Sequence, residues 1–305
     1  MIRISNLSRH YNDFKAVDNV SFDIQSGEVV GLLGHNGAGK TTIMKMMTAY
    51  LEASSGKIMI DNLDIENDTQ AIQKRIGYLP ENCPVWPEMT VIDYLEYQAA
   101  LHSVAPDMQQ RAVAKAINRT SLAEKATHKI QTLSRGYRQR VGVAQAILHN
   151  PDIIILDEPT NGLDPTQIKQ MRNLIHELAK EATVIISTHI LQEVQAVCDR
   201  VLIMRSGQLV VDAKLEELQS GQHLMLTIDN RQAESYLAKI DGVNGINACP
   251  KSNNHHCFAL DADFELAPEI VSAVHKAGDK LYSLQPEIRN LETVFAEVSK
   301  EVSYA

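Results

Sequence analysis

The sequence has few cysteines, no long apolar run and little positive charge, and each shortage excludes a class of protein. Its four cysteines lie far apart without a C-x-x-C pair, which excludes a disulfide framework and fits a reducing compartment. No stretch approaches the ~20 consecutive apolar residues of a membrane-spanning helix, and the N-terminal "MIRISNLSRHY" lacks the apolar core of a signal peptide. We therefore expect a cytoplasmic protein that does not cross a bilayer by itself.

Basic residues are outnumbered by acidic ones. Lys and Arg together number 29 and Asp and Glu 38, which gives a formal net charge of −9. A protein whose main partner is a nucleic acid or an anionic membrane usually carries a basic excess. We therefore expect no nucleic-acid partner, although local basic patches are compatible with this balance. The 305 residues are enough for two domains, each with its own core.

The first 218 residues alternate β-rich runs with helical patterns. The runs at 28–34, 75–81, 152–158 and 182–188 are continuously apolar, as is typical of strands buried on both faces of a parallel sheet. The segments "IRIS", "VSFDI", "GKIMID" and "RVLIMRSGQLVV" instead alternate or form hairpins, and we expect them at the edges. The sequence predicts an α/β core with an antiparallel β subdomain and a helical lobe at about residues 88–150.

Residues 219–305 have a different character. Their pattern predicts the order strand, helix, strand, strand, helix, strand, followed by one more helix. This order matches a ferredoxin-like α+β unit. The expected strands are 223–228, 246–249, 257–260 and 280–284, the expected helices are 232–240, 268–277 and 291–298, and "PKSNNHH" forms a polar turn. We expect a small accessory domain here, either regulatory or a packing appendage.

The stretch "GHNGAGKT" fits the phosphate-loop pattern G-x-x-x-x-G-K-[ST], directly after an apolar strand and before the helical run "TTIMKMMTAYL". Its glycines let the backbone N–H groups face a polyphosphate, and the helix N-terminus adds its positive end. Lys40 would reach the β- and γ-phosphates and Thr41 would ligate Mg²⁺. The predicted nucleotide-binding residues are Gly34, His35, Asn36, Gly37, Ala38, Gly39, Lys40, Thr41 and Thr42.

Two further strand ends carry polar side chains suited to phosphate chemistry. The strand "IIILD" leads into Asp157 and Glu158, which suits Asp157 for holding Mg²⁺ and Glu158 for polarising an attacking water as general base. His189 follows another apolar strand, and neighbouring strand ends meet at one sheet edge, so it is a candidate near the γ-phosphate. A purely structural histidine is the alternative. Tyr11 could stack on an adenine.

A helix start in "LSRGYRQRVG" at 133–142 has no ligand in its own neighbourhood. Ser134 is the predicted cap, and Gly136 allows a close approach. In the following segment "NGLDP", Asp164 is the predicted cap of a helix that begins at Pro165.

These motifs, in this order, resemble the ATP-binding subunits of ABC transporters over roughly residues 2–218. The resemblance implies a Walker A loop at 34–42, a signature motif at "LSRGYRQ" and, at "YLPE", a Q-loop. It also implies the following roles: adenine stacking for Tyr11, Mg²⁺ ligation for Glu81, Walker B for Asp157 and Glu158, D-loop for Asp164 and switch histidine for His189.

Two motifs depart from the commonest family pattern. Glu81 stands where most members have glutamine, and "YLPEN" is similar to the version in ATPases of the gliding-motility and nitrous-oxide-reductase-maturation type. In the signature, Arg135 and Tyr137 replace a glycine and a glutamine. Arg135 could lie near phosphates held by a second chain or point to solvent. The ending "PEIRNLETVF" resembles the tail of ABC-2-type export ATPases, with two extra residues before the leucine.

The resemblance implies a Mg-ATP hydrolase that forms a homodimer on ATP, with Ser134 and Gly136 contacting the nucleotide in trans. It would drive a separate integral membrane permease, contacted through the helical lobe, from the cytoplasmic face of the inner membrane. Alternatives are a soluble ABC ATPase acting on ribosomes or DNA, and a small-molecule P-loop kinase. The sequence disfavours both, because it has one cassette, net negative charge and a signature that a kinase would not use. We expect no metal site at "HHC" (255–257), since consecutive strand residues point to opposite faces.

Overall fold

The computed structural model describes residues 1–219, 223–249, 255–286 and 291–300. Within these residues the chain forms two compact units. One comprises Met1–Leu215 together with residues 298–300, and the other comprises Glu216–Glu297. Each unit has its own buried hydrophobic cluster or clusters. Among the described residues, no helix has the length and apolar character needed to cross a membrane.

The first unit is built on a six-stranded sheet with the strand order β10-β9-β3-β8-β7-β6. All neighbours are parallel except β9 and β10, which form an antiparallel hairpin. The four continuously apolar runs became β3, β6, β7 and β8. The hairpin expected in "RVLIMRSGQLVV" is present, and its second strand β10 lies at the sheet edge. The edge position was wrong for its first strand: β9 is an inner strand between β3 and β10, and its four central residues are buried. The bounds are β3 (Val29–Leu33), β6 (Ile76–Leu79), β7 (Ile153–Asp157), β8 (Thr183–Thr188), β9 (Arg200–Arg205) and β10 (Gln208–Lys214).

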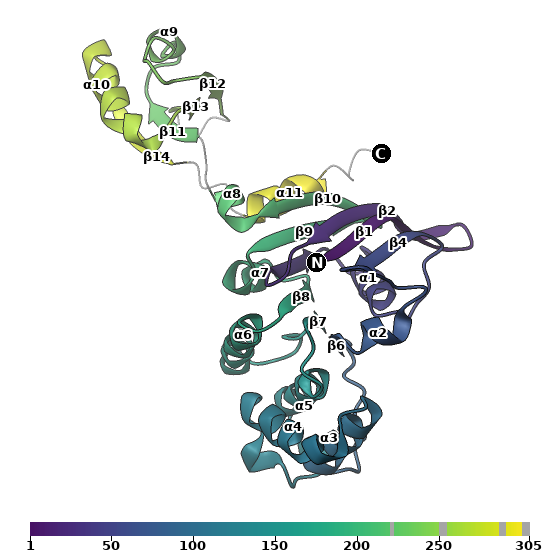
Figure 1. The fold of residues 1–305 in the computed structure, drawn as a ribbon. Coiled ribbons are helices and arrows are strands. Elements are labelled where there is room, and N and C mark those ends of the chain that lie inside the picture. Colours follow the sequence, from purple (N-terminus) through teal and green to yellow (C-terminus); the bar gives the residue numbers. More distant parts are fainter. Residues whose placement is uncertain (220–222, 250–254, 287–290, 301–305) are drawn as a thin grey trace. The chain divides into compact units, whose positions relative to one another are not determined.

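A second, antiparallel sheet packs near this one and has the order β2-β1-β4-β5 (Figure 1). The side chains of strand β7 contribute to hydrophobic clusters on both faces of the parallel sheet. Ile154 and Leu156 join one hydrophobic cluster, and Ile153 and Ile155 join the other, because side chains alternate across a strand. The bounds are β1 (Ile2–Tyr11), β2 (Phe14–Ile24), β4 (Ser55–Ile60) and β5 (Leu63–Asp64).

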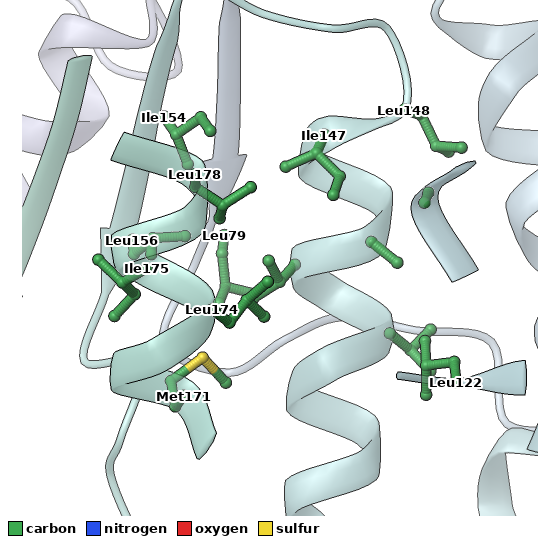
Figure 2. Close-up of a cluster of buried hydrophobic side chains, with 14 of the residues drawn as sticks. Leu79, Leu122, Ile147, Leu148, Ile154, Leu156, Met171, Leu174, Ile175 and Leu178 are labelled. Atoms are coloured by element: carbon green, nitrogen blue, oxygen red, sulfur yellow. The ribbon is translucent and has the colours of Figure 1, made fainter. Parts of the chain in front are cut away.

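Helices cover both faces of the parallel sheet. The cluster on one face includes residues of α5 and α6 (Figure 2), and the cluster on the other includes α1, α2 and the antiparallel sheet. Helices α3, α4 and α5 form the helical lobe. The bounds are α1 (Lys40–Met47), α2 (Thr69–Gln73), α3 (Val91–Leu101), α4 (Pro106–Arg119), α5 (Arg135–Ile147), α6 (Pro165–Ala179) and α7 (Leu191–Val197), with short 3₁₀ turns at Ala123–Lys125 and Ile130–Thr132.

The second unit has a four-stranded antiparallel sheet with the order β12-β13-β11-β14. Helix α9 is shorter than the sequence predicts. The expected turn at 250–256 and the tail motif at 286–295 lie partly outside the described residues. From the end of β10 onward the bounds are α8 (Leu215–Gln219), β11 (His223–Ile228), α9 (Glu234–Leu237), β12 (Gly245–Ala248), β13 (His256–Asp261), a 3₁₀ turn (Phe264–Leu266), α10 (Ala267–Ala277), β14 (Leu281–Pro286) and α11 (Leu291–Lys300).

Candidate functional site

The phosphate loop connects the end of β3 to the start of α1, and two of its glycines have no room for a side chain. A Cβ on Gly34 would lie 2.5 Å from the carbonyl oxygen of Met204. Gly39 has φ +104°, and a Cβ there would lie 2.6 Å from the carbonyl oxygen of Ala16. Only glycine fits such a left-handed and crowded position. The loop is therefore clamped between β9 and the β1–β2 hairpin.

Lys40 begins α1 and is buried within the loop. Its Nζ donates hydrogen bonds to the carbonyl oxygens of Gly34 at 2.6 Å and His35 at 3.3 Å. The same atom lies 3.8 Å from Oε1 of Glu158, with both side chains less than a tenth exposed. Burial lowers the pKa of Lys40, and the negative charges of Glu158, Asp157 and Glu81 oppose that shift. The lysine thus sits among the predicted acidic residues.

Asp157 ends β7 and is completely buried. Its Oδ1 accepts hydrogen bonds from the hydroxyls of Thr41, at 3.3 Å, and Ser187. Its Oδ2 is buried and has no hydrogen-bond partner among the described groups. An unpaired carboxylate oxygen in a buried position is costly, and it is a ligand that Mg²⁺ prefers. The pair of Asp157 and Thr41 therefore fits a divalent cation.

Glu158 follows in the left-handed backbone region, with φ +49°. Its N–H donates to the carbonyl oxygen of Ser187 at 3.1 Å and lies 3.2 Å from the Ser187 hydroxyl. Its carboxylate oxygens lie 3.0 and 3.1 Å from Nδ1 of His189. Because a carboxylate can only accept, Nδ1 carries the proton and Nε2 is free to accept or donate elsewhere.

Ser187 is a residue that the sequence analysis missed. It faces Asp157 directly in the parallel register of β7 and β8, and it connects both acidic residues to the strand that carries His189. Its position two residues before His189 was the available signal, because alternate residues of a strand share a face.

Tyr11 and Glu81 lie at the periphery of this group. Tyr11 ends β1 with 45% of its surface exposed, and the Arg9 guanidinium lies 4.7 Å from its ring centroid. Glu81 is exposed in the loop after β6, close enough for its charge to act on Lys40. Both side chains are accessible to a ligand.

The signature residues form a second group at the start of α5. The Ser134 hydroxyl accepts from the N–H of Tyr137 at 3.4 Å, as its predicted capping role requires. A Cβ on Gly136 would lie 2.6 Å from the side chain of Gln167. Asp164 caps α6 by accepting from the N–H of Gln167 at 2.9 Å. Within the described residues no hydrogen bond joins Ser134 or Gly136 to the phosphate loop.

The side chain of Arg135 is exposed, and its guanidinium lies close to Gly162 in the "NGLDP" segment of its own chain. A Cβ on Gly162 would lie 2.5 Å from Cζ of Arg135, and Gly162 has φ +71°. The arginine therefore ties the start of the signature helix to the loop after β7.

A phosphate loop beside two strand-end acidic residues defines a P-loop nucleoside triphosphatase. The family described as "ABC transporter" matches residues 17–161. NatA of Bacillus subtilis (strain 168), an ABC transporter ATP-binding protein, is 37% identical over 224 residues, which cover 72% of this chain and 91% of NatA. The uncharacterized ABC transporter ATP-binding protein YdbJ of the same organism is 31% identical over 302 residues, covering 98% of this chain and 95% of YdbJ.

Solved structures of ABC transporter cassettes are also similar to this chain. The dimeric structure of MJ0796, a bacterial ABC transporter cassette, matches with a TM-score of 0.65 and 25% identity over 70% of this chain and 99% of that one. The structure of cbiO1 from Clostridium perfringens, part of the ABC transporter complex cbiONQ, matches with a TM-score of 0.65 and 29% identity over 71% of this chain and 89% of its own. The chain belongs to the ABC transporter ATP-binding family, and its hydrolysis of ATP is coupled to transport.

Proposed function

We propose that this chain is one of two identical subunits that bind Mg-ATP, dimerise around it and drive a separate integral membrane permease, in the export direction. The observation that carries the proposal is the convergence of Lys40, Asp157, Glu158 and His189 at one sheet edge, in a chain of this family. The phosphate-loop residues 34–42 would bind the phosphates, and the exposed ring of Tyr11 would stack on the adenine.

Thr41, Asp157 and Glu81 would hold Mg²⁺. The unpaired Oδ2 of Asp157 and the adjacent Thr41 hydroxyl support the first two. Glu81 is supported by its electrostatic proximity to Lys40. When bound, the ion would neutralise charge that develops on the β- and γ-phosphates.

Glu158 would accept the proton of the attacking water, and His189 would hold the Glu158 carboxylate in place. The two contacts from Nδ1 fix the carboxylate, and Nε2 is left available for the γ-phosphate or the water. Lys40 would stabilise charge on the phosphate oxygens, because a buried ammonium has little competing water.

Ser134 and Gly136 would complete the site of the opposite subunit. They lie at the start of the 13-residue helix α5, whose N-terminal end carries partial positive charge that favours a phosphate. In a symmetric dimer each chain would give its loop to one nucleotide and its signature to the other. The dimeric cassette among the similar structures supports this arrangement.

The helical lobe would contact the permease, and the chain would lie peripherally on the cytoplasmic face of the membrane. Export rests on the resemblance of the tail to export ATPases. The second unit would be a ferredoxin-like module that regulates or stabilises the dimer, which the element order and the sheet order β12-β13-β11-β14 support.

The test is Glu158→Gln. We expect ATP affinity close to that of the native chain, a fall in turnover of about 10²- to 10⁴-fold because the general base is lost, and a stable dimer with ATP in size-exclusion chromatography. Glu96→Gln, an exposed carboxylate on α3, is the matched control and should behave as native. Native turnover in Glu158→Gln would refute the role of Glu158, and fractionation with ribosomes rather than membranes would refute the permease.

A further inference from the structure

Two cysteines of the second unit, Cys249 and Cys257, face each other across neighbouring strands. Cys257 lies in β13, and Cys249 directly follows β12. The antiparallel register pairs Ala248 with Phe258, so the next residues along the two strands are the cysteines. The N–H of Cys249 donates to the carbonyl oxygen of Cys257 at 2.9 Å, as direct cross-strand partners require. Two residues that lie eight positions apart in the sequence are therefore neighbours in the fold.

Both thiols lie on the face of the sheet opposite to the buried cluster. Phe258 and Leu260 belong to that cluster, together with residues of α9 and α10. Because side chains alternate along a strand, Cys257 and its partner point the other way. In the same register row follow Thr227 of β11 and Ser283 of β14, which are small polar residues. The two thiols are half-buried, so a small molecule can reach them.

The spacing of such a pair allows a disulfide but strains it. The Cα atoms of a hydrogen-bonded antiparallel pair lie about 5.5 Å apart, within the ~4.4–6.8 Å that disulfides span. Their Cβ atoms are typically about 4.5–5.5 Å apart, whereas a relaxed disulfide needs roughly 3.5–4.5 Å. Strained and accessible disulfides are readily reduced and are typical of regulatory sites. The pair is therefore suited to a bridge that opens and closes.

Metal binding does not account for this pair. In the described part of the chain, no group of three or more His, Cys, Asp or Glu side chains is arranged to hold a metal ion. Thiol oxidation is the chemistry that two facing cysteines support by themselves.

We propose that Cys249 and Cys257 form a reversible disulfide that fixes the edge strand β12 to β13. The oxidant is a low-molecular-weight disulfide, RSSR. The thiolate of one cysteine attacks RSSR, which forms a mixed disulfide and releases RS⁻. The thiolate of the other cysteine then attacks the protein sulfur of the mixed disulfide, which forms the bridge and releases a second RS⁻. The two thiol protons leave with these products as two RSH, and an excess of RSH reverses the exchange. The bridge lies within the second unit, so it does not depend on the proposed function.

The two cysteines of the first unit provide internal controls. The thiol of Cys83 donates to the carbonyl oxygen of Arg138, and burial raises its pKa to about 11. Burial also raises the pKa of Cys198. Both therefore stay protonated at neutral pH, and the thiolate is the reactive form. We expect oxidation to spare them.

The test equilibrates the reduced full chain with mixtures of reduced and oxidised glutathione. The remaining thiols are alkylated with N-ethylmaleimide under denaturing conditions and counted by intact mass. We expect all four cysteines to be alkylated in the reduced chain and two fewer in the oxidised chain, with full recovery when reduced glutathione is added. Lys251 separates the two cysteines in the sequence, so a tryptic digest of the oxidised chain should contain peptides 240–251 and 252–276 joined by a disulfide.

Variants separate an internal bridge from general thiol oxidation. Cys257→Ser should carry one glutathione on Cys249, because no second thiol is present to displace it. Cys198→Ala is the matched control and should form the bridge at a glutathione ratio within about twofold of the native one. In the oxidised native chain, hydrogen exchange of the β12 amides should slow, because a bridged edge strand opens less often. Unchanged exchange would refute the fixing of β12.

Three further results would overturn the proposal. They are four alkylated cysteines at every glutathione ratio, an oxidised form whose bridge contains Cys83 or Cys198, and a bridge that joins two chains on a non-reducing gel.

Discussion

Arg135 shows how one side chain can have a role that its motif does not reveal. In the commonest pattern of the family, this signature position holds glycine. A positively charged side chain there would be expected to attract a phosphate. The structure instead places the guanidinium over Gly162 of the same chain. The contact joins two loops that the proposed dimer would bring to the nucleotide, so we expect Arg135 to act by positioning them.

This contact predicts coupling between Arg135 and Gly162. Gly162→Ala should destabilise the chain chiefly because φ +71° strains alanine, and its Cβ would also displace the exposed, flexible guanidinium. Arg135→Gly removes the collision but leaves the strain, so the double variant should be more stable than the sum of the single changes by about 0.5 kcal/mol or more. Urea unfolding of the four proteins measures this coupling.

ATP affinity provides the second readout. Arg135→Gly should leave the Kd for ATP within about twofold, because an interaction with Gly162 contributes little to ground-state binding. A tenfold weaker Kd, about 1.4 kcal/mol, would instead place the guanidinium on the phosphates and contradict the positioning role.

At the scale of elements, the signature helix α5 packs closely on the loop that follows β6. A Cβ on Gly142 would lie 2.4 Å from Sγ of Cys83 and 2.5 Å from Cδ1 of Leu79. Cys83 has φ +40°, and its thiol donates to the carbonyl oxygen of Arg138 at 3.3 Å. The loop that carries Glu81 and the helix that Ser134 caps are therefore packed directly against each other.

Gly142→Ala tests this packing. In an open helix interior the change from glycine to alanine stabilises by about 0.5–1 kcal/mol. Here we expect destabilisation of about 1–3 kcal/mol from overpacking. Adding Cys83→Gly frees the space and suits the positive φ, so it should restore part of the loss in urea unfolding. Stabilisation by Gly142→Ala alone would contradict the close contact.

The elements that sequence patterns identified were those whose burial is uniform. Strands β3, β7 and β8 are buried at every position because both faces are covered. Strand β9 was placed at an edge because its hairpin with β10 suggested an antiparallel ribbon, and pairing partners across the chain leave no local signal. The same limit hid the contact of Arg135 with Gly162. The residues of the phosphate loop and strand ends were identifiable because their spacing is local.

At the scale of the whole molecule, the separation of the two groups of site residues is the main feature. Within one chain the Lys40 group is held together by hydrogen bonds and an ion pair. In the signature group, Gly136 lies close to the side chain of Gln167 in α6. A composite site between two chains would use both groups without moving either across its own subunit.

Subunit mixing tests the composite site. Lys40→Ala and Ser134→Ala chains should each be nearly inactive alone. A mixed dimer contains one site with both native groups and one site with both defects, so mixing should recover a substantial fraction of native ATP turnover. The mixing control combines Glu96→Gln chains, which should be active, with Lys40→Ala chains. No recovery in the first mixture, with dimers confirmed by chromatography, would indicate that both groups serve one nucleotide in cis.

The turn between β9 and β10 lies outside the nucleotide motifs but contacts the phosphate loop directly. Its Gly207 donates its N–H to the carbonyl oxygen of Ala38 at 3.1 Å and accepts from the N–H of Asp18 at 2.9 Å. The turn therefore holds the phosphate loop to the antiparallel sheet through these two hydrogen bonds. At Gly207 φ is +82°, and a Cβ would lie 3.0 Å from the carbonyl oxygens of Ala16 and Lys15. A side chain there would loosen the phosphate loop. A substitution outside every nucleotide motif would therefore have the effect of a binding-site mutation.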